Sequence, residues 1–215
     1  RSQIDIISRS QPELMFHPVD DQLSLEKALV GKTAVVVGPG LGQSEWGSRM
    51  LSGVLASGLP GVVDADALNL LAQRPRRTRQ MILTPHPGEA CRLLNTDMNT
   101  IQAHRFDSSS NIQSQYDCIC VLKGPGTLVA VEGRYFWLCK EGNPGMATAG
   151  MGDVLSGVIG ALLCQGLVPR DAAIAGVWIH SRAADLAVLD DGERGLLASD
   201  LWRYLRRLVN DPYSG

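Results

Sequence analysis

The chain has 215 residues, of which 45% are hydrophobic, and its formal net charge at pH 7 is −2. This length allows one domain with a large buried core, and the charge balance argues against a nucleic-acid-binding surface, which requires clustered positive charge. No uninterrupted apolar run approaches the ~18 residues that span a bilayer, and no signal peptide is visible. We therefore expect neither a nucleic acid nor a membrane as a partner.

The cysteines predict a reducing compartment. Cys118 and Cys120 alternate in a strand-like run, which is a poor spacing for a metal clip, and the total of five cysteines is odd. Such thiols pack as small apolar side chains, which predicts a cytoplasmic protein. The chain begins at Arg1 and enters the strand-like run "IDIISR" at once, which indicates a fragment or a processed chain.

Short apolar runs alternate along the chain with segments of helical spacing. Runs rich in β-branched residues predict strands, and apolar residues three and four apart predict helices. The helix over 99–116 is the weakest, because "DSSSN" is poor helix material. The predicted strands are 33–38, 61–66, 81–84 and 118–124, with a hairpin over 127–139 that turns at Glu132-Gly133; the predicted helices are 46–58, 67–73, 87–94, 99–116, 153–163, 171–189 and 200–209.

Strands that each lead into a helix predict an α/β fold with a central, mostly parallel sheet covered by helices on both faces. Ligands bind beyond the carboxyl ends of such strands. After the first strand, "GPGLG" (Gly38–Gly42) lets the backbone approach a ligand, although a plain tight turn explains it equally well. After the second, Asp64 is placed to line a site, whereas Asp66 fits as the N-cap of the next helix.

The next two strand ends carry a histidine and a lysine. Pro85 and Pro87 hold His86 in an extended conformation. Glu89 either caps the following helix or contacts a magnesium ion through water. In "LKGPGT" the Lys123 ammonium and the amides after it can contact a phosphate; the alternative is a lysine that extends to solvent before a turn.

A carboxylate marks the start of a predicted helix at the end of "GNPGMATAGMGD" (142–153). The small residues place several backbone N–H groups at a helix N-terminus, which stabilises negative charge such as that of a transferring phosphoryl group. Asp153 can accept a proton from a substrate hydroxyl beside these amides. A purely capping role for Asp153 is the weaker interpretation, because glycine and other small residues are so dense before it.

Together these motifs resemble the ADP/ATP-dependent NAD(P)H-hydrate dehydratases of the ribokinase-like superfamily. They are "GPGLG", "DADALNLLA", "LTPHPGEACRLL", "VLKGPGTLV" and "GNPGMATAGMGDVLSGVIGALLCQG", in family order over nearly the whole chain. The resemblance implies a single ribokinase-like domain over 1–215 that repairs hydrated NADH and NADPH: ADP or ATP phosphorylates the ring hydroxyl, and phosphate then leaves. It further implies Mg²⁺ as a cofactor and a homo-oligomer, with a tetramer favoured.

The resemblance also implies which residues contact each ligand. Asp153 is the implied catalytic base, and Glu89 is similar in place to a glutamate linked to magnesium. The hydrate-binding residues that the resemblance implies are Gly42, His86 and Asp153, and we predict Gly40 and Asp64 beside them. The nucleotide-binding residues that it implies are Lys123, Gly124, Pro125, Gly126, Thr127 and Gly152, and we predict Asn143 and Gly150 beside them.

The chain departs from the family pattern in three places. Pro125 stands where the family usually has alanine, and proline lacks an N–H that could bind phosphate. The "DSSSN" segment is a weaker helix than relatives carry there. Nothing matches the family's additional first strand and helix, or the epimerase domain of many bacterial members, so we expect a cut or incomplete version of a longer protein.

Two other functions fit the same residues. One is a ribokinase-like kinase for a small alcohol or a vitamin precursor, which releases a phosphorylated product, whereas the dehydratase releases free phosphate. The other is a truncated, non-catalytic homologue that binds nucleotide. The missing N-terminal segment and Pro125 favour this last function, and the intact "GMGD" argues against it.

Overall fold

The computed structural model describes residues 13–132 and 135–210, and its framework is a six-stranded sheet in the order β1-β2-β3-β4-β5-β6. The first four strands are parallel, and the pairs β4–β5 and β5–β6 are antiparallel. The parallel strands therefore end at one edge of the sheet. The strands are β1 (Val35–Val37), β2 (Gly61–Val63), β3 (Met81–Leu83), β4 (Ile119–Leu122), β5 (Leu128–Val131) and β6 (Tyr135–Leu138).

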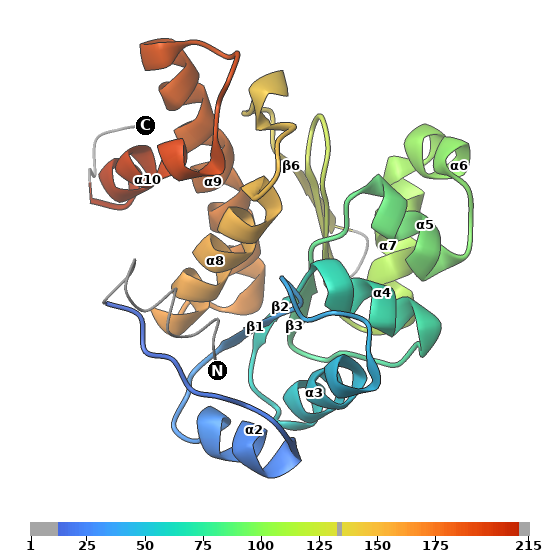
Figure 1. The fold of residues 1–215 in the computed structure, drawn as a ribbon. Helices are drawn as coiled ribbons and strands as arrows, with labels where there is room; N and C mark the ends of the chain where they lie inside the picture. Colours follow the sequence, from blue (N-terminus) through green and yellow to red (C-terminus); the bar gives the residue numbers. More distant parts are fainter. Residues whose placement is uncertain (1–12, 133–134, 211–215) are drawn as a thin grey trace.

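Helices cover both faces of this sheet (Figure 1). One face carries α8, α9 and α10, and the other carries α3 to α7, with α2 packed against α3. This arrangement confirms the predicted α/β fold. The helices are α2 (Gln22–Leu29), α3 (Glu45–Ala56), α4 (Ala65–Gln73), α5 (Pro87–Leu94), α6 (Met98–Ala103), α7 (Arg105–Tyr116), α8 (Met151–Cys164), α9 (Pro169–Asp191) and α10 (Leu201–Asn210), with short 3₁₀ turns η2 (Pro144–Met146) and η3 (Ala198–Asp200).

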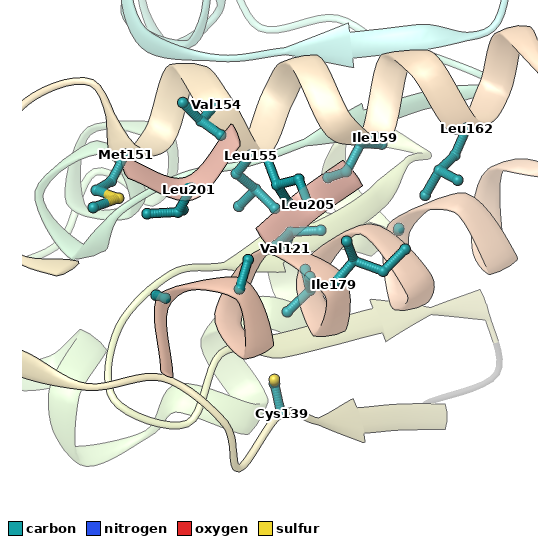
Figure 2. Packing of buried hydrophobic residues seen from close by; sticks show 14 of the residues in the cluster. Val121, Cys139, Met151, Val154, Leu155, Ile159, Leu162, Ile179, Leu201 and Leu205 are labelled. Carbon is teal, nitrogen blue, oxygen red and sulfur yellow. The ribbon is translucent and has the colours of Figure 1, made fainter. Parts of the chain in front are cut away.

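Adjacent residues of one strand point into different cores. Val62 of β2 belongs to the core with α8 and α9, whereas Val63 belongs to the core with α3 and α4, and both are fully buried. Because side chains alternate between the faces of a strand, a strand covered on both sides requires apolar residues at every position. Figure 2 shows the first core, in which Leu155 and Ile159 of α8 lie near side chains of α9 and α10.

The α9 helix is long and largely apolar. Among the described residues it is the one helix long and apolar enough to cross a membrane by length and composition, although Arg182 and Asp185 interrupt its apolar run. Its apolar side chains pack against α8, α10 and the sheet. Core helices of this kind pass the same length and composition test.

The segment predicted as one helix over 99–116 forms two helices, so that prediction was wrong. His104 leaves the helical conformation (φ −129°, ψ 49°), which ends α6 before α7 starts at Arg105. The "DSSSN" segment is nevertheless helical. Ser108 and Ser109 are buried in α7, and the Ser109 hydroxyl donates a hydrogen bond of 2.9 Å to the carbonyl of Phe106, which satisfies its polar group locally.

The hairpin and most of the cysteines agree with their predictions. Val131 of β5 lies opposite Tyr135 of β6, while the predicted turn residue Gly133 and the run "IDIISR" lie outside the described residues. The cysteines are free thiols, and burial raises the pKa of the Cys120 thiol. Cys164 differs from the packing prediction because it is exposed on α8.

Two helical glycines test how tightly α8 and α9 pack. A Cβ at Gly176 of α9 would lie 2.6 Å from Cγ1 of Ile159, whereas nothing lies within 4 Å of a Cβ at Gly157 of α8. We expect Gly176→Ala to lower the free energy of unfolding by about 1–3 kcal/mol through overpacking. Gly157→Ala should raise it by up to ~1 kcal/mol through helix propensity. Urea denaturation of both variants checks this, and equal effects would show that the interface yields to a methyl group.

Candidate active site

A buried carboxylate joins two strands and a helix where the parallel strands end. Asp64 directly follows β2 and is 1% exposed. Its Oδ1 lies 2.9 Å from Nζ of Lys123, the residue after β4, and its Oδ2 accepts a hydrogen bond of 2.7 Å from the hydroxyl of Ser156 on α8. Burying a charge is costly unless it is paired and hydrogen-bonded, and here both oxygens have partners.

The Lys123 ammonium faces the site rather than solvent. The lysine side chain is 20% exposed, and Oε2 of Glu89 lies 3.9 Å from Nζ, farther away than Asp64. A Cβ at Gly152 would lie only 3.2 Å from Nζ, so glycine leaves room for the ammonium beside the start of α8. The backbone N–H of Lys123 also donates a hydrogen bond of 2.9 Å to the carbonyl of Pro85, which joins the two loops.

His86 forms the N-cap of α5, and this role fixes its ring. Nδ1 accepts a hydrogen bond of 2.9 Å from the N–H of Gly88. A neutral imidazole that accepts at Nδ1 carries its proton at Nε2, which lies 3.6 Å from Oε1 of Glu89. Burial, followed by the positive charges of Lys123 and Arg92, lowers the pKa of His86. The ring is therefore neutral near pH 7 and offers Nε2–H as a donor.

Glu89 caps the same helix. Its Oε2 accepts a hydrogen bond of 2.8 Å from the N–H of His86, and burial raises the pKa of Glu89. Residues 13–132 and 135–210 contain no group of three His, Cys, Asp or Glu that could hold a metal ion, whereas magnesium at phosphate sites needs only one or two carboxylates beside water and the substrate phosphates. The observed contacts are those expected if Glu89 caps α5, and we assign no step of a reaction to a magnesium ion.

The glycine-rich turn after β1 is held by Asp66. The N–H of Gly42 donates a hydrogen bond of 2.9 Å to Oδ2 of Asp66. The prediction that Asp66 caps α4 was wrong: Asp64 is the N-cap, and Asp66 is the second helical residue, whose carboxylate reaches across to the turn. Gly38 is needed because a Cβ there would overlap the carbonyl oxygen of Asp64. Gly40 is exposed, with a φ of +65°.

An arginine that the sequence analysis did not single out holds the loop after β4. Arg105, the first residue of α7, donates hydrogen bonds to the carbonyls of Gly126 at 2.9 Å, Leu122 at 3.3 Å and Lys123 at 3.5 Å. A cation in the first turn of a helix interacts unfavourably with the helix dipole. Its presence there indicates a role other than stabilising the helix. That signal becomes readable only when the helix is known to start at Arg105. The Thr127 hydroxyl closes the loop by donating to the carbonyl of Gly124 at 3.1 Å, and Pro125 is exposed.

The start of α8 lies beside the Asp64–Lys123 pair. Gly150 is the N-cap, with the left-handed backbone (φ 86°) that favours glycine, and Asp153 is the third helical residue. A Cβ at Gly152 would lie 3.7 Å from Oδ2 of Asp64, so the pair borders the first turn of α8. Asp153, which is exposed, is the next residue in the sequence, while the N-cap position belongs to Gly150.

Asn143 ties the segment before α8 to α9. Its Nδ2 donates a hydrogen bond of 2.9 Å to Oδ1 of Asp185, whose Oδ2 accepts one of 2.9 Å from the N–H of Gly142. The buried Oδ1 of Asn143 has no hydrogen-bond partner among the described residues. None of these contacts of Asn143 involves Lys123. The structure therefore places this predicted nucleotide-binding residue beside α9.

Two polar residues on buried helices also went unnoticed in the sequence. Ser156 reaches Asp64 from α8, and His180 of α9 is 5% exposed. The His180 ring lies beside the backbone of Met151, the first residue of α8, and its buried Nε2 has no hydrogen-bond partner among the described residues. Burial, followed by the charge of Lys123, lowers the pKa of His180 to about 4. The available signal was a polar residue within an apolar helical run or at its end, which also occurs in cores that bind nothing.

The sheet order and this strand-edge site define the ribokinase-like class of α/β proteins. A solved ribokinase-like superfamily protein from Enterococcus faecalis has a TM-score of 0.71 at 27% identity, and the match covers 87% of this chain and 63% of that chain. The family model described as NAD(P)H-hydrate dehydratase matches residues 1–207. The chain belongs to the NAD(P)H-hydrate dehydratase family.

Individual relatives agree with this assignment. The chain is 52% identical over 207 residues to the bifunctional NAD(P)H-hydrate repair enzyme Nnr of Coxiella burnetii, covering 96% of this chain and 42% of that protein. It is 32% identical to the ADP/ATP-dependent NAD(P)H-hydrate dehydratase of Bacillus subtilis co-crystallized with ATP/Mg²⁺, with a TM-score of 0.83 over 97% of this chain and 75% of that chain. The chain spans about two fifths of the length of the curated bifunctional relatives it matches.

Acid should destabilise the protein through His180. The unfolded state takes up a proton below pH 6.5, whereas the folded state resists protonation until about pH 4. The stabilising difference is therefore present above pH 6.5 and is lost as the pH falls to about 4, by about 3 kcal/mol in total. Urea unfolding across this range should show a shallower pH dependence for His180→Gln than for the wild type. The exposed His17→Gln serves as the control, and equal slopes in all three proteins would contradict the assignment.

Proposed function

We propose that the chain catalyses the ADP/ATP-dependent dehydration of hydrated NADH and NADPH, a repair of the nicotinamide cofactor. The observation that carries the proposal is the Lys123 ammonium, held by Asp64 directly beside Gly152 in the first turn of α8. A fixed cation at a helix N-terminus favours a phosphoryl group. The family of the chain and the names of its relatives support the choice of substrate.

Phosphorylation converts the ring hydroxyl of the hydrate into a better leaving group. In the proposed reaction, Asp153 takes the hydroxyl proton while the oxygen attacks the terminal phosphorus of ADP or ATP, and the bond to the departing nucleotide breaks. The ring C–O bond then breaks, and phosphate leaves with the bonding electrons. Loss of a proton from the neighbouring ring carbon restores the double bond, so the products are the dinucleotide, phosphate and AMP or ADP.

The proposed binding residues form two groups around Lys123. The hydrate lies on the side of His86, whose neutral ring offers Nε2–H, and the nucleotide lies on the side of the loop after β4. Magnesium would enter with the phosphates and water, and Glu89, whose carboxylate also caps α5, is the proposed residue for a water-mediated contact with it. The proposed hydrate contacts are Gly40, Gly42, Asp64, His86 and Asp153, and the proposed nucleotide contacts are Lys123, Gly124, Pro125, Gly126, Thr127, Asn143, Gly150 and Gly152.

We also propose that the protein is a cytoplasmic homo-oligomer. The free thiols support a reducing compartment. Large apolar side chains on and before α10, with Leu197 56% and Trp202 58% exposed, offer a surface for another copy. Sedimentation analysis of the purified chain tests the tetramer that the family resemblance favours.

Asp153→Asn should abolish most turnover while the fold and nucleotide binding persist. The amide keeps the size of the side chain but cannot take the proton, and a general base contributes about 10²–10⁴-fold. Release of phosphate from ADP with hydrated NADH measures the effect. Asp171→Asn is the matched control, because Asp171 is also an exposed third residue of a helix; it reports the loss of dipole stabilisation together with the loss of a surface ion pair to Arg170. Near-full activity of Asp153→Asn would remove Asp153 from the chemistry.

The products separate the proposal from its two rivals. A stable phosphorylated product without free phosphate would identify a kinase. Binding of ADP without any turnover of the hydrate would identify a non-catalytic homologue. Either result would overturn the dehydratase assignment.

His86→Ala should reduce kcat/KM for the hydrate and leave the affinity for ADP nearly unchanged, because the proposed hydrate site lies beside His86 and the nucleotide site does not. The expected loss is about tenfold or more, the scale of one hydrogen bond to a polar ligand group. His86→Asn separates binding from capping, since asparagine can cap α5 but has no imidazole. If His86→Asn restores both stability and full activity, the ring serves only the helix.

A further inference from the structure

Arg105 crosses from α7 to the loop after β4 and bonds to three of its carbonyl oxygens. The contacts are 2.9 Å to Gly126, 3.3 Å to Leu122 and 3.5 Å to Lys123. The guanidinium is half-buried, and burial lowers the pKa of Arg105 without removing its charge. A rigid fork of donors thus occupies one side of the loop on which the proposed nucleotide site depends.

Carbonyls that face a cation turn their peptide N–H groups the other way. In a planar trans peptide the C=O of one residue and the N–H of the next point in opposite directions. The direction of the Lys123 carbonyl therefore fixes the direction of the Gly124 N–H, and the direction of the Gly126 carbonyl fixes that of the Thr127 N–H. Both N–H groups point away from Arg105, and Pro125 between them contributes no N–H.

The first peptide of the series shows that this geometry holds. The carbonyl of Leu122 faces Arg105 at 3.3 Å, and the N–H of the following Lys123 donates a hydrogen bond of 2.9 Å on the opposite side, to Pro85. For the next peptide, no described residue accepts a hydrogen bond from the N–H of Gly124. This donor is left for a ligand on the side of the loop opposite the arginine.

The close approach also restricts the residue at position 124. Gly124 has a φ of +136°, and a Cβ there would lie 2.8 Å from Nη1 of Arg105. A side chain at this position would therefore displace the guanidinium as well as strain the backbone. The position of the Arg105 guanidinium is therefore one reason why residue 124 is a glycine.

We propose that Arg105 is a positioning residue that makes the loop over 123–127 a phosphate receptor by holding its carbonyls away from the anion and its amides toward it. The proposal deepens the proposed function, since it concerns the phosphates of the same adenine nucleotide. It requires no contact between Arg105 and the nucleotide. The guanidinium also adds a positive charge behind the loop, which favours an anion in front of it.

Arg105→Gln and Arg105→Lys test the proposal by calorimetric titration with ADP and, separately, with inorganic pyrophosphate. Lysine keeps the charge and the stem but cannot span several carbonyls, so both variants should bind each anion about tenfold more weakly or worse. KM for the nucleotide should rise far more than kcat falls. Arg79→Gln is the matched control, because Arg79 pairs with Asp117 on the surface, and it should bind like the wild type.

A second measurement does not depend on how well the variants fold. In the wild type, pyrophosphate or ADP should shift the amide proton resonances of Gly124 and Thr127 more than the side-chain resonances of Arg105. Unchanged affinity in Arg105→Lys and Arg105→Gln, unshifted amides, or no binding of either anion by the wild type would each overturn the proposal. The variants can bind the anions more weakly even if the wild type does not dehydrate the hydrate. That combination would refute the proposed function and leave the role of Arg105 standing.

Discussion

The buried ion pair between Asp64 and Lys123 is the interaction on which the arrangement of the site depends. A carboxylate that is 1% exposed requires a cation, and the Ser156 hydroxyl satisfies its second oxygen. Removing one partner of a buried pair typically costs 3–5 kcal/mol, because the other charge is left unpaired. The pair fixes the ends of β2 and β4 against the first turns of α8. The hydrogen bond from Lys123 to the carbonyl of Pro85 then places the His86 loop in the same frame.

The fold could be predicted from the sequence because its signals are local. Three-residue strands such as β2 are buried on both faces, so they appear as unbroken apolar runs followed by helices with clear starts. The α5 helix follows from Pro87 at its first position and Glu89 in its first turn. The break between α6 and α7 could not be read in this way. It depends on a single residue, His104, whose backbone leaves the helical conformation although no proline or glycine marks the position.

The site was only partly predictable, for a similar reason. Residues that follow strands, such as Asp64, His86 and Lys123, are placed by the topology alone. Ser156 and Arg105 act from helices on opposite faces of the sheet, and neither has a local pattern that distinguishes it from a buried serine or a surface arginine. Asp66 was misassigned because a first-turn aspartate is a good cap in isolation, and only the folded structure brings the Gly42 amide to it.

The separation in sequence of the paired residues has a kinetic consequence. The Asp64–Lys123 contact spans 59 residues and the Asp64–Ser156 contact spans 92. Contacts between residues so far apart in the sequence close large loops, and they form more slowly than local helices. The site therefore cannot exist in a partly assembled chain, and any ligand that binds there binds the native state alone. Such a ligand reports complete folding. By mass action it lowers the unfolded fraction of the protein, and the effect grows with the ratio of the ligand concentration to its dissociation constant.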